Sequence, residues 1–324
     1  MLVCSICGTS EKDEYHSFEV DEYGEGFWCE DCDGYTNFNG EKRNQFVLIL
    51  EDKMNKGKSI KKNTYKLKKQ LSPYRYPGGK SKVIDYLSTY IREEKTERLV
   101  SPFTGGASFE LALLEAGIIN NLHINDLDTG VFSFWWTVKH WPYHLIDKIR
   151  NTIPTHEMYF KAQNVIKSGY KNINIFDAAW ISILVNRLAY SGISKAGPLG
   201  GKKGKIDNLL SRWNPETLIN RIENIHSLSN RIEVTQMNAV ELIEEAYWHD
   251  NTTIFIDPPY VEKGKALYDC FYIERDHMEL SFLLDHLWRG CPGADIIVTY
   301  DYNKWLKNLY DYPNVEILNR KYSI

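Results

Sequence analysis

The chain has 324 residues and a mass of 37.8 kDa, enough for a large domain with a smaller module beside it. Hydrophobic residues make up 43% and charged residues 25%, which excludes an intrinsically disordered chain. No apolar run reaches the about 18 residues of a transmembrane helix, and the N-terminus lacks a secretory signal, so we expect a cytoplasmic protein with no membrane contact.

The net charge of −4 hides an uneven distribution along the chain. Residues 1–40 carry a net charge of −9, residues 41–72 carry +7, and residues 73–324 carry −2. Such segregation indicates modules with different roles.

Two C-x2-C pairs stand in the acidic N-terminal stretch. Cys4 with Cys7 and Cys29 with Cys32 can supply the four thiolates of a tetrahedral zinc site. In a reducing compartment such thiols favour a metal over disulfides, although a redox-active pair is the alternative. We expect a structural Zn²⁺ module over residues 1–45. A zinc ribbon often binds nucleic acid, but the negative charge of this module would repel phosphates, so we weigh binding of a protein partner or a scaffolding role at least equally.

Residues 46–72 are predicted to form a basic linker. The stretch 51–69 contains eight lysines and few residues for a core. It is either a solvated connection or a tether that lies along a phosphate backbone, and the two interpretations are compatible.

Strand-like and helical patterns alternate from residue 73 onward. We predict strands at 98–100, 122–125, 232–235, 252–256 and 294–299. A helix is predicted at 108–116, and the stretch 128–230 is mostly helical. The aromatic residues Trp135, Trp136 and Trp141 are expected in the core of that helical stretch. The alternation predicts an α/β fold, a Rossmann-like, mostly parallel sheet that binds its ligand at the carboxyl ends of the strands.

Two features of residues 98–126 indicate a cofactor that contains a nucleoside. Gly105 and Gly106 lie in a turn between a predicted strand and helix, where a ligand can approach the backbone and the helix amides. Asp126 follows the next strand, at the distance from Gly106 where an acid commonly accepts hydrogen bonds from a ribose.

The predicted strand 252–256 ends in the sequence Asp257-Pro258-Pro259-Tyr260. The prolines fix the backbone, so that a carboxylate and a carbonyl together can accept both hydrogens of an exocyclic amine. Tyr260 offers a ring on which a base can stack. The residues Tyr268, Phe271 and Tyr272 follow, and they either pack or close over such a base.

These motifs resemble the Dam-like, alpha-group DNA N6-adenine methyltransferases. DPPY is similar to that family's catalytic signature, and FTGGAS resembles its S-adenosylmethionine loop. Tyr76-Pro77-Gly78-Gly79-Lys80 resembles its WAGGK element, and residues 186–192 resemble its NRxxYNG segment. The last residues, 319–323, resemble its late R-x-x-S strand. The resemblance covers about 73–324 and implies a methyltransferase domain with a target-recognition insert at about 135–230.

The resemblance also implies roles for individual residues. The catalytic residues would be Asp257, Pro258, Pro259 and Tyr260, acting on an adenine flipped out of double-stranded DNA. S-adenosyl-L-methionine would be bound by Tyr76, Gly78, Gly79, Lys80, Pro102, Phe103, Thr104, Gly105, Gly106, Asp126, Asn238 and Asp257. Of these, Lys80 and the two glycine amides would hold the methionyl end and Asp126 the ribose. Asn238 would contact the cofactor's adenine, or it is a helix cap.

The recognition segment departs from the family pattern, so the target sequence does not carry over. We expect DNA contacts from Asn186, Arg187, Tyr190, Ser191, Lys195, Lys202 and Lys203, although the lysines are equally typical of a solvated loop. Ser101 stands where the family usually has an acid. Methylation of RNA adenine or of cytosine N4, and a silent nucleic-acid-binding scaffold, are the alternatives to DNA adenine methylation.

Overall fold

The computed structural model describes residues 18–20, 26–29, 34–37, 44–52, 67–261, 264–290, 292–310 and 313–319. Within these ranges the chain forms a small antiparallel sheet and a large parallel one, the latter with helices on both faces. No helix among the described residues has the length and apolar character needed to cross a membrane.

The small sheet belongs to the acidic N-terminal stretch. It contains β1 (Phe18–Val20), β2 (Gly26–Cys29) and β3 (Gly34–Asn37), with antiparallel pairing throughout. Cys29 ends β2 and is buried, whereas Cys4, Cys7 and Cys32 lie outside the described residues. The described part of the chain holds no group of three or more metal-ligating side chains. The predicted zinc site therefore stays a prediction.

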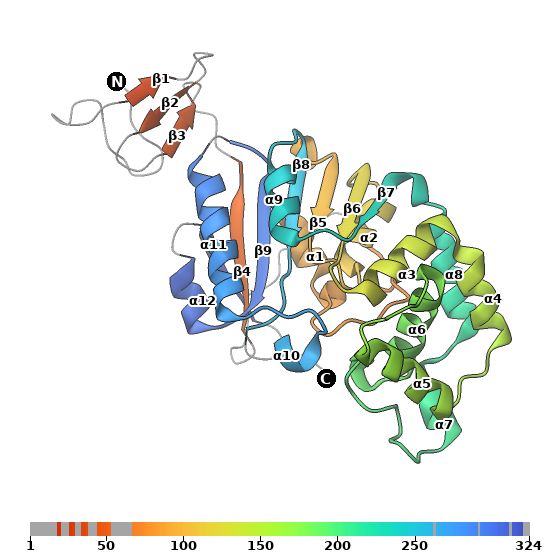
Figure 1. Ribbon diagram of the computed structural model, residues 1–324. Helices are drawn as coiled ribbons and strands as arrows, with labels where there is room; N and C mark the ends of the chain where they lie inside the picture. The colour runs from red at the N-terminus through yellow and green to blue at the C-terminus, as the bar shows by residue number, and fades with distance from the viewer. Residues whose placement is uncertain are drawn as a thin grey trace.

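The large sheet has seven strands among the described residues, in the order β10-β4-β9-β8-β5-β6-β7 (Figure 1). Every neighbouring pair in it is parallel. The strands are β4 (Phe46–Asp52), β5 (Arg98–Ser101), β6 (Asn121–Asn125), β7 (Ile232–Thr235), β8 (Thr252–Ile256), β9 (Asp295–Asp301) and β10 (Asn314–Asn319). This confirms the predicted Rossmann-like α/β class and each predicted strand after residue 73.

Strand β4 corrects the predicted domain boundary. Residues 46–52 were expected in a basic linker, but they pair with β9 on one side and β10 on the other. The five residues from Phe46 to Leu50 are all buried, because an interior strand of a parallel sheet is covered on both faces. The lysine-rich residues 53–66 lie outside the described residues.

Alternate side chains of β4 pack into two different cores. Leu48 and Leu50 join the core beneath α9 (Ala239–Tyr247), α11 (Glu274–Arg289) and α12 (Lys304–Leu309). Val47 and Ile49 join the core of the other face, with α1 (Ile84–Leu87) and α2 (Ser108–Glu115). Two-sided burial of this kind stabilises the sheet through about 1.5–3 kcal/mol for each fully buried aliphatic side chain.

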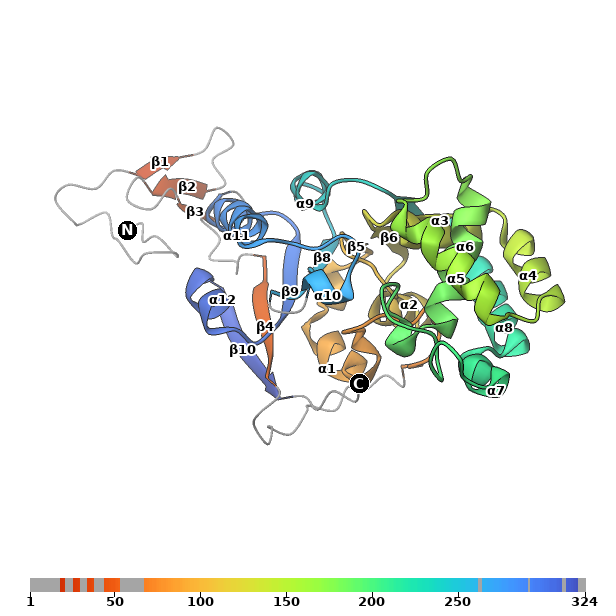
Figure 2. The same ribbon diagram turned by 60° about the horizontal axis from the view of Figure 1, so that its bottom comes forward.

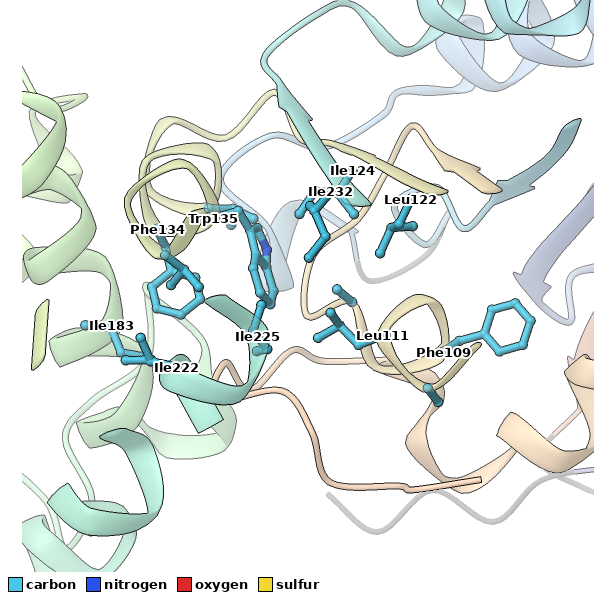
Figure 3. Packing of buried hydrophobic residues seen from close by; sticks show 14 of the residues in the cluster. Phe109, Leu111, Leu122, Ile124, Phe134, Trp135, Ile183, Ile222, Ile225 and Ile232 are labelled. Carbon is cyan, nitrogen blue, oxygen red and sulfur yellow. The ribbon is translucent and has the colours of Figure 1, made fainter. Parts of the chain in front are cut away.

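A group of helices lies between β6 and β7 in the chain and on the β7 side of the sheet (Figure 1), to the right of β6 in Figure 2. Its members are α3 (Thr129–His140), α4 (Pro142–Asn151), α5 (His156–Lys167), α6 (Ile175–Leu188), α7 (Ile206–Leu209) and α8 (Pro215–His226). Phe134 and Trp135 of α3 pack against Ile183, Ile222 and Ile225 of α6 and α8 (Figure 3). The predicted helical character of this stretch is confirmed.

The predicted burial of the three tryptophans is correct only in part. Trp135 is 2% exposed and Trp136 is half-buried, but Trp141 is 59% exposed. Trp141 follows the last residue of α3 and precedes Pro142, so the helix ends before this side chain can turn inward.

Candidate active site

A pocket opens at the carboxyl ends of the strands, between β5 and β8, where the strand order reverses. Such a switch point is where open α/β sheets bind ligands. Phe103 and Gly106 line it from the loop after β5, Asp126 from the loop after β6, Asn238 from that after β7 and Asp257 from that after β8. Its empty space, with the open mouth included, is about 920 Å³.

Most of the residues expected to bind the cofactor line this pocket. They are Tyr76, Gly79, Lys80, Pro102, Phe103, Thr104, Gly106, Asp126, Asn238 and Asp257. Gly78 and Gly105 do not line the pocket but pack against tyrosine rings of the site. A side chain at Gly78, whose φ is +82°, would meet the hydroxyl of Tyr260 at 2.2 Å. A side chain at Gly105, with φ +48°, would meet the ring of Tyr76 at 2.7 Å, so both positions require glycine.

Asp257 is held by donors from two other parts of the chain. Lys80 Nζ donates to Asp257 Oδ1 at 2.6 Å, and the Thr299 hydroxyl donates to the same oxygen at 2.8 Å. Lys80 is only 3% exposed, and it also donates to the Gly78 carbonyl at 3.2 Å. The carboxyl group is thus fixed at one oxygen by two charged or polar neighbours, and it is 20% exposed toward the pocket.

Aromatic rings form the wall beside Asp257. Tyr260 is buried, and the ring of Tyr268 meets it edge-on at 6.1 Å between centroids. Tyr268 also stacks on Tyr76 at 5.5 Å with an interplanar angle of 19°, and its hydroxyl donates to the Pro77 carbonyl at 3.2 Å. Tyr268, which follows DPPY in the chain, therefore packs against Tyr260 and Tyr76 and also lines the pocket.

Asp126 organises the glycine turn after β5. Its carboxylate accepts hydrogen bonds from the Gly105 amide at 2.8 Å and from the Asp128 amide at 3.0 Å. The Gly105 amide is therefore engaged within the protein. Burial raises the pKa of Asp126 to about 7, Asp128 adds to the rise, and the two amide hydrogen bonds oppose it.

Glu110 is a pocket residue that the sequence patterns did not single out. It lies on α2, is 3% exposed, and accepts a hydrogen bond from the Ser101 hydroxyl at 2.8 Å. Burial raises the pKa of Glu110 to about 7, and Asp257 contributes to the rise. The signal in the sequence was a lone acid among the apolar residues 109–114, on a helix that starts at the cofactor turn.

Asn238 caps α9. Its side-chain oxygen accepts a hydrogen bond from the Val240 amide at 2.9 Å. The residue is exposed and also lines the pocket, so the helix-cap role is confirmed and the contact to the cofactor's adenine stays a prediction.

Two of the residues expected to contact DNA have structural roles here. Asn186 is 3% exposed, accepts from the Arg75 amide at 2.8 Å, and donates to the carbonyls of Arg75 and Gly192. Arg187 donates to the carbonyls of Arg212 and Pro73. The buried amide of Asn186 therefore fixes the segment before Tyr76, and its contact to DNA stays a prediction.

The other expected DNA contacts lie at the surface. Tyr190 is 54% exposed, Ser191 has a left-handed backbone with φ +55°, and Lys202 and Lys203 are exposed. Lys195 donates to the Lys265 carbonyl at 3.2 Å and to the Tyr268 carbonyl. Lys195 thus connects the segment after α6 to the loop that covers Tyr260.

The fold and the pocket are those of a Rossmann-like methyltransferase. A family model for the D12 class N6 adenine-specific DNA methyltransferases matches residues 76–324, and the chain belongs to this family. Comparison with curated protein sequences gives no match, so the assignment rests on the family model and the site. The protein is accordingly an enzyme that methylates adenine in DNA at N6.

Proposed function

We propose that the enzyme transfers a methyl group from S-adenosyl-L-methionine to an adenine flipped out of double-stranded DNA into the space beside Asp257. The observation that carries this proposal is the position of Asp257. It lies where the cofactor pocket meets the DPPY turn, with Oδ1 fixed by Lys80 and Thr299. A carboxylate so fixed presents its other oxygen to one substrate orientation.

The chemistry of the pocket suits S-adenosylmethionine. Three carboxyl groups line it, those of Glu110, Asp126 and Asp257. Asp126 would accept hydrogen bonds from ribose hydroxyls, and Glu110 would face the ammonium of the methionyl end, since a buried carboxyl with a raised pKa gains from a cation nearby. The bound cofactor supplies an electrophilic methyl group.

Asp257 and the Pro258 carbonyl would accept the two hydrogens of the adenine amino group. This holds the nitrogen lone pair toward the methyl donor, and most of the acceleration then comes from positioning two bound reactants. Tyr260 would stack on the ring of the base. Tyr268 lies edge-on against Tyr260, so entry of the base requires the Tyr268 loop to shift.

The helical group α3–α8 is the candidate for target recognition. Exposed lysines after α6, among them Lys202 and Lys203, would contact phosphates, and Tyr190 and Ser191 lie on the same connection. The acidic N-terminal stretch would bind Zn²⁺ through its four cysteines and dock a protein partner. In support, Cys29 is buried at the end of a strand in a three-stranded sheet.

Two binding measurements test the site. Calorimetric titration with S-adenosylmethionine should show binding to the wild-type protein and at least about tenfold weaker binding to Asp126→Asn, because the hydrogen bonds from the ribose hydroxyls to the carboxyl group are lost. DNA with 2-aminopurine at the mapped adenine should gain fluorescence when the enzyme binds. Normal cofactor affinity in Asp126→Asn, or unchanged fluorescence, would contradict the assigned placement.

The metal content of the full chain tests the N-terminal assignment. Elemental analysis should find about one zinc per chain, and a Cys4→Ser, Cys7→Ser variant should lose it. Purified protein without zinc, and with intramolecular disulfides, would support the redox alternative instead.

A further inference from the structure

Strand β4 brings a buried acid to the active site from outside the region that the family model matches. Glu51 is the residue before the last of β4 and is 1% exposed. Its register partner on β9 is Asp301, so it lies at the carboxyl edge of the sheet. The family match begins at residue 76, and no motif of the sequence pointed to Glu51.

Glu51 and Asp257 share one ammonium group. Lys80 Nζ lies 3.5 Å from Glu51 Oε1 and 2.6 Å from Asp257 Oδ1. Lys80 and Glu51 are almost completely shielded from water, at 3% and 1% exposure. Ionised, Glu51 and Asp257 place two negative charges beside the single positive charge of Lys80. The buried carboxyl of Asp301 lies next to Glu51 in the strand register. Such charges act strongly where water is excluded.

The reaction creates positive charge next to this group. N6 supplies the electron pair of the new N–C bond, the sulfur–methyl bond breaks with its pair on sulfur, and the positive charge moves from sulfur to N6. N6 then releases a proton to water. A fixed net negative charge beside N6 therefore stabilises the transition state more than the ground state.

We propose that Glu51 is a positioning residue for methyl transfer. It shares the positive charge of Lys80 with Asp257, so that the Asp257 carboxylate keeps its negative charge as it accepts a hydrogen bond from the N6 amino group. Without the Glu51 charge, the ammonium of Lys80 would be attracted less to Glu51 and would draw more of the negative charge of Asp257. This inference rests on the proposed function, because it takes N6 to lie against Asp257.

The test compares the chemical step with binding in full-length Glu51→Gln. Under single turnover, with DNA and S-adenosylmethionine both saturating, the methylation rate should fall at least about tenfold, the range in which preorganised charges act. Dissociation constants for DNA and for the cofactor should stay within about twofold of wild type. Glu51→Asp keeps the charge and should retain more of the rate than Glu51→Gln.

Asp295→Asn is the matched control. Asp295 is a 3% exposed carboxylate at the start of β9, ion-paired with Arg92 and away from the carboxyl edge. It should lower the melting temperature without changing the single-turnover rate. Equal rates for Glu51→Gln and Asp295→Asn, or for Glu51→Gln and Glu51→Asp, would overturn the inference. If the proposed function were wrong, the result would be a different one, because the wild-type enzyme itself would then leave adenine unmethylated.

Discussion

Asp257 depends on neighbours that are remote from it in the chain. The DPPY sequence identified the carboxylate, and the resemblance of residues 76–80 to the family's WAGGK element identified a second part of the site. Thr299 and Glu51 could not be found in this way, because a threonine or glutamate in a strand has no local signature. Their roles arise from the strand order, which places β4 and β9 beside each other and β8 next to β9.

Glu110 gives the stability of the cofactor-free protein a pH dependence. Its pKa rises from 4.5 in the unfolded chain to about 7 in the folded protein. Between these values the unfolded chain loses its proton while the folded protein keeps it, so stability falls as pH rises from 4.5 to about 7 and then levels off.

Glu110→Gln should remove this part of the pH dependence. Urea denaturation at pH 5 and pH 8 checks this. The free energy of unfolding of the variant minus that of wild type should be larger at pH 8 than at pH 5. The same difference between variant and wild type at both pH values would show that Glu110 ionises normally.

Helix α3 connects the helical group to the cofactor turn. The indole N–H of Trp135 donates to the Gly105 carbonyl at 2.9 Å, inside the core. Trp135→Phe should therefore destabilise the protein by about 1–3 kcal/mol, because a buried carbonyl loses its partner and a small cavity forms. It should also weaken cofactor binding severalfold, since the turn is less well fixed. Calorimetry of unfolding and of binding measures both, and unchanged cofactor affinity would contradict the link.

The connection after α6 is exposed and basic, as a phosphate-binding loop requires. A double variant, Lys202→Ala with Lys203→Ala, should lower DNA affinity at low salt by about three- to tenfold and reduce the salt slope by about 1–2. Its melting temperature should not change, because both side chains are exposed. Fluorescence anisotropy at several salt concentrations gives the slope, and a slope equal to wild type would exclude these lysines from the interface.

The sequence predicted the strands and helices after residue 73 better than it predicted which segments and side chains are buried. The apolar strands after residue 73 have lengths and flanking turns that predict them well, whereas β4 was assigned to a linker because eight lysines follow its first residues. The apolar run at residues 46–50 was the available signal. The burial of Asn186 could not be predicted from its motif either, because a motif gives residue types but not burial.

For the whole molecule, the fold requires more chain than the family match covers. A chain of residues 44–324 should fold and methylate DNA, because the large sheet with its two cores lies in that range. A chain of residues 67–324 lacks β4, leaves β9 and β10 without their shared neighbour, and should fail to fold. Circular dichroism and thermal unfolding distinguish the two, and a cooperative transition in the shorter chain would contradict the importance of β4.

Nucleoside mass spectrometry shows whether the enzyme methylates adenine at N6 and whether Asp257 is needed for it. DNA incubated with the enzyme and S-adenosylmethionine should acquire N6-methyladenine, and Asp257→Ala should lower the rate by at least about 100-fold, because the amino group is no longer oriented. Methylated adenine at a similar rate with Asp257→Ala, or DNA that acquires N4-methylcytosine instead, would contradict the account.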